Sequence, residues 1–328
     1  MMYFTGIDIS KNKIDVCWLR DAHKGKKKSK VLKNNTDGHQ ALAKWLLDNI
    51  KAKPEQVIVT LEPTGVYHET LMYFLHDHGF KVYLVNSGYA KKYAQAINLT
   101  HKTDKSDAFM LANYGCAQQG HIEFWKPEPI EVRELNALLR RLDALEADYK
   151  RELNRLDSSE FGLSSERVVM SLKDMLQALE TEIKKLTEDI DDHINRNPEL
   201  KNNRKLLGSI PGIGSVLSRE LTYLFASKTF KNAKEVGAYL GLIPKLNESG
   251  KLKGRTTLSK AGPSRIRAKL YMAAIVAGQF NHSIKAQKSR LLAKGKTKMQ
   301  ALGAAMRKLA QMCFGVIKNQ TEYQPQVT

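Results

Sequence analysis

The spacing of apolar and polar residues in the first 125 residues changes repeatedly between patterns typical of strands and patterns typical of helices. Strands are expected at residues 5–9, 13–19, 30–35, 56–63 and 81–87, and helices at 38–50, 68–79, 90–97 and 104–112. The first three strands follow one another directly, which favours an antiparallel meander with the lysine-rich residues 23–28 as a turn. Helices separate the later strands, and this order is typical of a sheet that continues in parallel.

A leucine-rich seam marks the middle of the chain, after Pro127 and Pro129. Its positions recur at spacings of three and four residues, first at Leu135, Leu138, Leu142, Leu145 and Tyr149, and again at Leu172, Leu176, Leu179, Ile183, Leu186 and Ile190. Charged residues flank both runs, so the pattern predicts two long helices that form a coiled-coil arm. The helices could pair within one chain or between subunits.

Helical patterns return in the last third, on both sides of the sequence IPGIG at residues 210–214. Further helices are expected at 231–242, 265–280 and 299–317. The fold class is therefore α/β plus all-α. We divide the chain into an α/β domain (1–125), the arm (126–204), a helical domain (205–320) and a flexible tail (321–328).

The net charge of +19 is concentrated near the C-terminus. Residues 205–328 contain 22 Lys and Arg but 4 Asp and Glu, a net of +18, whereas residues 126–204 carry a net of −4. So few acids among so many bases favour a nucleic-acid partner over a merely soluble basic domain. No apolar run approaches the roughly 20 residues of a membrane span. The start has no signal-peptide pattern, and three widely separated cysteines form no disulfide framework, so we expect a cytoplasmic protein.

Four acidic residues of the first third stand where carboxylates are costly or crowded. Asp8 and Glu62 end apolar strands, and Asp104 and Asp107 begin a helix on one face, where they repel each other. Each alone could be a cap or the partner of a lysine. Together they resemble the acidic set of RNase H and RuvC nucleases, which hold divalent cations with oxygen ligands. The start GIDIS also resembles a sugar-kinase phosphate loop, but no second such loop is evident.

The last third offers two kinds of nucleic-acid chemistry. IPGIG resembles a helix-hairpin-helix turn, in which Gly212 and Gly214 would let backbone N–H groups approach a phosphate, although a plain helix connection fits too. Ser249, Ser259 and Ser264 lie among basic residues that could offset charge on an attacked phosphate. Ser249 precedes a glycine in a basic loop and is the best candidate nucleophile of the three. We expect phosphate contacts from Gly212, Gly214, Lys251, Lys253, Arg255, Lys260, Arg265 and Arg267.

The motifs GIDIS, LEPTG, HKTDKSDA, IPGIG, GLIP, NESG, GR, LSKAG and LYMAA occur in the order seen in the DEDD transposases of the insertion-sequence one-ten family. The chain resembles this family, which includes the Piv pilin-gene invertases and bridge-RNA-guided recombinases, over almost its whole length. The resemblance implies a RuvC-like domain whose Mg²⁺ (or Mn²⁺) is held by Asp8, Glu62, Asp104 and Asp107, and a C-terminal transposase domain with Ser249 as nucleophile.

The same resemblance implies donor and target DNA as partners, a noncoding bridge RNA, and homodimers that assemble into a tetramer. Three alternatives stay open at this point. They are a Piv-type site-specific DNA invertase, a metal-dependent junction-resolving nuclease that leaves Ser249 unused, and an architectural DNA-binding protein. The presence of all four acids counts against the last of these.

Overall fold

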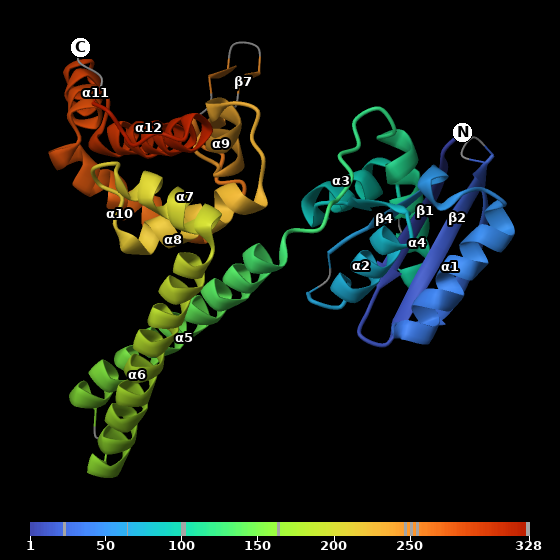
Figure 1. Ribbon diagram of the computed structural model, residues 1–328, viewed down its shortest axis with the longest axis horizontal. Coiled ribbons are helices and arrows are strands. Elements are labelled where there is room, and N and C mark those ends of the chain that lie inside the picture. The colour runs from blue at the N-terminus through green and yellow to red at the C-terminus, as the bar shows by residue number, and fades with distance from the viewer. Residues whose placement is uncertain are drawn as a thin grey trace. The chain divides into compact units, whose positions relative to one another are not determined.

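A computed structural model describes residues 1–21, 24–63, 65–99, 103–162, 165–245, 248–249, 252–253 and 256–325. The chain forms two compact units, Met1–Pro127 and Glu128–Thr328. The first unit contains a five-stranded sheet with helices, and the second is mostly helical (Figure 1). This agrees with the predicted α/β and all-α parts, while the finer division into three domains and a tail stays a prediction.

The sheet of the first unit has the order β3-β2-β1-β4-β5. Its strands are β1 (Tyr3–Ile9), β2 (Lys13–Asp21), β3 (Lys26–Lys33), β4 (Val57–Leu61) and β5 (Lys81–Leu84). The first three strands are antiparallel, and β1–β4 and β4–β5 are parallel, as the sequence predicts. The lysine-rich turn is shorter than expected, because β3 already begins at Lys26 and pairs three of those lysines with β2.

Helices cover both faces of this sheet. They are α1 (Thr36–Ile50), α2 (Glu69–Asp77), α3 (Ser87–Ala96) and α4 (Asp104–Ala117), with a short 3-10 turn η1 (Pro54–Gln56) before β4. Alternate residues of a strand point to opposite faces. Ile7 of β1 and Ile14 of β2 therefore pack with Leu42 of α1 and Leu71 of α2, while Gly6 faces α4.

The predicted arm is a hairpin within one chain. Its helices α5 (Ile130–Phe161) and α6 (Glu166–Arg196) run side by side (Figure 1). The expected break is shorter than the sequence suggests, because α5 continues through Ser158 and Ser159, whose hydroxyls donate to helix carbonyls. The buried positions are Val132, Leu135, Leu139, Leu142, Leu145, Leu186, Ile190 and Ile194 of the arm and Leu200 just beyond it, and Tyr223 further along the chain packs against them. The base of the arm therefore shares a core with the helices that follow.

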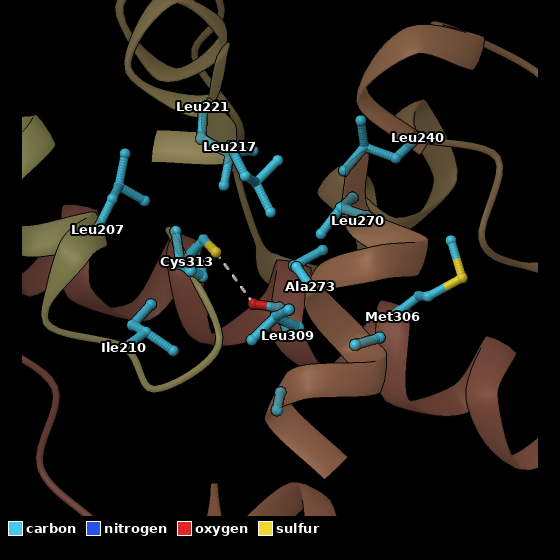
Figure 2. Close-up of a cluster of buried hydrophobic side chains, with 14 of the residues drawn as sticks. Leu207, Ile210, Leu217, Leu221, Leu240, Leu270, Ala273, Met306, Leu309 and Cys313 are labelled. Atoms are coloured by element: carbon cyan, nitrogen blue, oxygen red, sulfur yellow. Dashed lines mark hydrogen bonds between the residues drawn. The ribbon is translucent and has the colours of Figure 1, made fainter. Parts of the chain in front are cut away.

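Those helices are α7 (Pro198–Gly208), α8 (Ser215–Ser227), α9 (Ala233–Tyr239), α10 (Ser264–Phe280), α11 (His282–Ala293) and α12 (Lys298–Asn319). Their apolar faces meet in one core, where Leu207, Leu217, Leu270 and Leu309 are buried (Figure 2). The Cys313 thiol lies in this core and donates to the Leu309 carbonyl oxygen at 3.1 Å. Burial raises the pKa of this thiol, so it behaves as a packing residue.

Residues 321–325, the described part of the predicted tail, contact α7 and the residue that follows it. The Tyr323 backbone N–H donates to the Ser209 hydroxyl at 2.8 Å, and Glu322 pairs with Lys205. These contacts hold the described part of the tail against α7. No helix in the described part of the chain is long and apolar enough to cross a membrane.

Candidate active site

The first candidate site lies where β1 and β4 end side by side. The parallel register pairs Ile7 with Leu61, so the next residues, Asp8 and Glu62, follow from neighbouring strands. Both are half-buried. Asp8 is on the same face of β1 as Gly6, two residues earlier, and this face is covered by α4. The sheet thus brings together two of the four predicted acids.

Close packing of α4 brings the other two acids to the same place. A Cβ on Gly6 would lie 2.1 Å from the Ala108 carbonyl oxygen, so only glycine permits this approach. The helix begins with a capping box in which Thr103 accepts from the Ser106 N–H at 3.2 Å and donates its own N–H to the Ser106 hydroxyl. Asp104 and Asp107 both lie in the first turn, directly after the Thr103 cap.

The electrostatics of Asp8 show that the acids influence one another. The pKa of Asp8 is raised from 3.8 to about 6, first by burial of the carboxyl group and then by the negative charges of Asp104, Asp107 and Asp15. Four carboxylates, Asp8 and the three that raise its pKa, are therefore close enough to repel one another, and all but Asp15 were predicted as site residues. The sequence indicated this crowding for Asp104 and Asp107 but not for Asp15.

Two residues of this locus, Asp15 and Lys13 on β2, were missed from the sequence. Asp15 lies directly opposite Asp8 in the antiparallel ladder, and its side chain is only 5% exposed. The Lys13 Nζ is 3.0 Å from Asp15 Oδ2 and also hydrogen-bonds Asp104 Oδ2. The signal was available in the short Ser10–Asn12 connection, because a hairpin that pairs Ile9 with Ile14 must also pair Asp8 with Asp15.

The donor set suits a hard divalent cation, because carboxylate oxygens are the ligands that Mg²⁺ and Mn²⁺ prefer. The mutual repulsion felt by Asp8 is the kind that a bound cation relieves. Among the described residues, however, no three His, Cys, Asp or Glu side chains converge closely enough to hold an ion. Asp104 is instead engaged by Lys13, so ligation requires that side chains move.

The second candidate site is the basic loop that contains Ser249. Two short strands, β7 (Glu248–Ser249) and β8 (Leu252–Lys253), form a hairpin in which Ser249 pairs with Leu252. A second pair, β6 (Pro244–Lys245) and β9 (Thr257–Leu258), closes the base of the loop. Ser249 is therefore next to the turn of a two-stranded hairpin. Lys251 and Arg255, two predicted phosphate contacts, lie outside the described residues.

The other two candidate serines lie outside this hairpin. The Ser259 hydroxyl accepts from the Ala261 N–H at 3.2 Å and so caps the turn before α10. Ser264 begins α10, as the sequence predicts. Neither observation tests the role of Ser249.

Three of the basic residues predicted to contact phosphate lie in different surroundings. Lys260 is exposed. Arg267 donates to the carbonyl oxygens of Ala261 at 3.0 Å and Leu240 at 3.2 Å, and so fastens the end of α9. Arg265 pairs with the buried Glu220 at 2.7 Å and with Asp143 of the arm. Arg265 and Arg267 thus face protein partners, and a nucleic-acid contact by either stays a prediction.

The IPGIG turn connects α7 to α8, as predicted. Gly212 has φ +104°, and a Cβ there would lie 2.5 Å from the Cβ of Ala277, so this glycine serves close packing. Gly214 precedes the N-terminus of α8, and a Cβ added there would meet no other atom within 4 Å. It borders a pocket of about 670 Å³ whose wall includes Lys201, Arg204 and Lys205. Of the two glycines, Gly214 has the space for a phosphate.

Comparison with known proteins finds two family matches along the chain. Residues 5–159 match the DEDD transposase family of the IS110 type, and residues 204–289 match the transposase family described as IS116/IS110/IS902. A pilin gene-inverting protein of Moraxella bovis is 30% identical over 328 residues, which cover 99% of this chain and 98% of that protein. The chain belongs to the IS110 transposase family.

Two further relatives fit this assignment. The pilin gene-inverting protein of Moraxella lacunata is also 30% identical over 99% of this chain and 98% of its own length. An IS900 uncharacterised 42 kDa protein of Mycobacterium paratuberculosis is 25% identical over 165 residues, covering 49% of this chain and 40% of that protein. The IS110-family chain described here is an enzyme that cleaves and rejoins DNA.

Proposed function

We propose that this IS110-family enzyme is a metal-dependent DNA recombinase that uses Ser249 as its nucleophile. The observation that carries the metal part is the close packing of α4 against β1 at Gly6, which supports a common locus for Asp8, Asp104 and Asp107, and the raised pKa of Asp8 agrees with it. Asp8, Glu62, Asp104 and Asp107 would hold Mg²⁺ or Mn²⁺. The ion would supply positive charge that stabilises a phosphate as negative charge develops on it.

Ser249 is proposed to form the covalent link. Its hydroxyl oxygen would bond to the phosphorus of a DNA phosphate while the bond from phosphorus to one deoxyribose oxygen breaks. A general base accepts the proton of the Ser249 hydroxyl. The departing deoxyribose oxygen takes up a proton and leaves as a hydroxyl group at the DNA end. Attack by a DNA hydroxyl on the phosphorus of the phosphoserine then rejoins the strand: the bond from phosphorus to the Ser249 oxygen breaks, the attacking hydroxyl gives up its proton, and the serine oxygen takes up a proton. Support comes from the hairpin position of Ser249 and from the basic character of residues 205–328.

The partners are proposed from the positive charge of the last third of the chain. A net charge of +18 over residues 205–328 suits donor and target DNA, and equally a noncoding bridge RNA whose base pairing would select the sequence. Homodimers pairing into a tetramer would bring the metal-binding acids of one subunit to the serine of another. A Piv-type invertase is the second candidate, favoured by the pilin gene-inverting relatives that match nearly the whole chain.

The test is whether DNA becomes attached to Ser249. We expect the wild-type enzyme, incubated with DNA carrying the element ends and a matching RNA, to yield a protein–DNA adduct that survives denaturation. Ser249→Ala should abolish the adduct, whereas Ser259→Ala and Ser264→Ala should retain it. Free nicks without attached protein, or an adduct that persists in Ser249→Ala, would refute the serine mechanism and favour a hydrolytic nuclease.

A further inference from the structure

The ammonium group of Lys13 joins two carboxylates that belong to different elements. Its Nζ lies 3.0 Å from Asp15 Oδ2 on the same strand, and it hydrogen-bonds Asp104 Oδ2 at the start of α4, 91 residues away. A positive charge thus already sits among the acids proposed to hold the metal ion. Lys13 is therefore a candidate for controlling that ion.

The two partners of Lys13 differ in their freedom to move. The Asp15 side chain is 5% exposed and is fixed in the β1–β2 ladder, whereas the Asp104 side chain is 52% exposed on the first turn of a helix. A change of rotamer can release Asp104 from Lys13 without disturbing the sheet. The buried Asp15 side chain cannot turn away in this manner, so its ion pair with Lys13 persists.

We propose that Lys13 is an internal counter-ion that competes with the divalent cation for Asp104 and so sets the affinity of the site for metal. This inference rests on the proposed metal-binding role of the acids. In the metal-free protein Lys13 holds Asp104. When the cation binds, Asp104 turns to it, because a divalent charge attracts a carboxylate more strongly than an ammonium group at the same distance. Lys13 stays with Asp15.

This arrangement accounts for two observations together. No three carboxylates in the described part of the chain converge on one point, although four of them act on the Asp8 locus. The ion pair with Asp104 supplies the reason, since it draws one acid toward β2. Lys13 is thus a positioning residue, which touches a metal ligand rather than the DNA.

The experiment measures Mn²⁺ binding to the full-length protein by isothermal titration calorimetry. Lys13→Met should bind Mn²⁺ about fivefold more tightly than the wild type, because a competing ion pair is removed. Lys11→Met is the matched control, since Lys11 is an exposed lysine in the same hairpin. It should leave the affinity within about 1.5-fold. Equal or weaker binding by Lys13→Met, or an equal gain in Lys11→Met, would overturn the proposal.

A second measurement avoids substitution of Lys13. In nuclear magnetic resonance spectra of the wild-type chain, the Lys13 side-chain nitrogen signal should shift on addition of Mg²⁺, and the Lys11 signal should not. A stationary Lys13 signal would overturn the inference. Asp8→Asn separates it from the proposed function. If Asp8→Asn binds Mn²⁺ like the wild type, the acids do not form the site and both ideas fail. If Asp8→Asn loses binding while Lys13→Met is unchanged, only the role of Lys13 fails.

Discussion

Gly6 on β1 lies directly against Ala108 on α4, and a Cβ at Gly6 would be 2.1 Å from the Ala108 carbonyl oxygen. This contact fixes the distance between the strand that carries Asp8 and the helix that carries Asp107. A side chain at Gly6 would have to push the helix away from the sheet. The geometry of the acids therefore depends on a residue with no chemistry of its own.

We predict that Gly6→Ala lowers the free energy of unfolding of the first unit by about 1–3 kcal/mol, since overpacking forces backbone shifts. Urea unfolding followed by tryptophan fluorescence measures it, because all three tryptophans (Trp18, Trp45 and Trp125) belong to this unit. Gly120→Ala is the control, as a Cβ there meets nothing within 4 Å. Equal stability of the two variants would contradict the packing argument.

The raised pKa of Asp8 predicts how stability depends on pH without metal. Its pKa is 3.8 in an unperturbed chain and about 6 when folded, so the folded state holds the proton more tightly. The metal-free protein should therefore lose stability as the pH rises from about 4 to about 6. Asp8→Asn removes this loss, and at pH 7 in EDTA it should be more stable than the wild type by on the order of 1 kcal/mol, allowing for solvent screening.

Urea unfolding at pH 7 and at pH 4 checks this expectation, and the difference between the two proteins should vanish at the lower pH. Asp48→Asn, which changes an exposed carboxylate in the same unit, should show no such pH-dependent difference. If Asp8→Asn is less stable than the wild type at pH 7, the carboxylate is held by favourable contacts and the repulsion argument fails.

Arg265 is predicted to act on stability rather than on nucleic-acid binding alone. Glu220 is 1% exposed and is paired with both Arg265 and Lys269, which also reach Asp143 of the arm. Arg265→Ala leaves the buried carboxylate one partner short, which should cost about 1–3 kcal/mol. Thermal unfolding by circular dichroism, with the exposed Arg290→Ala as control, measures the effect. Unchanged stability with uniformly weakened DNA binding would instead assign Arg265 to phosphate contact.

The pocket beside Gly214 predicts a phosphate contact. Lys201 lines this pocket and is exposed, so Lys201→Ala should reduce the slope of log affinity for DNA against log salt by about 0.9, the share of one phosphate. Filter binding at several salt concentrations gives the slope. Lys173→Ala, an exposed lysine on the arm, is the charge-matched control and should leave the slope unchanged. Identical slopes in all three proteins would place the DNA elsewhere.

The sequence by itself determined the order of the elements and the type of each unit. The short apolar-rich runs at Tyr3–Ile9 and Lys13–Asp21 specified strands, and the leucine seam specified two long helices. It also placed Asp104 and Asp107 together, because residues three apart on a helix share a face. These features depend on residues close together in the sequence, so they can be predicted without knowing which distant segments pack together.

Only the tertiary structure decided which residues from distant segments meet. The strand register placed Asp15 opposite Asp8, and the Gly6 contact with α4 brought Lys13 within reach of Asp104. Likewise, Arg265 and Arg267 read as phosphate contacts in the sequence but face Glu220 and backbone carbonyls in the fold. The physical reason is that a charge in a sequence has no partner until packing supplies one, and packing depends on contacts between residues far apart in the chain.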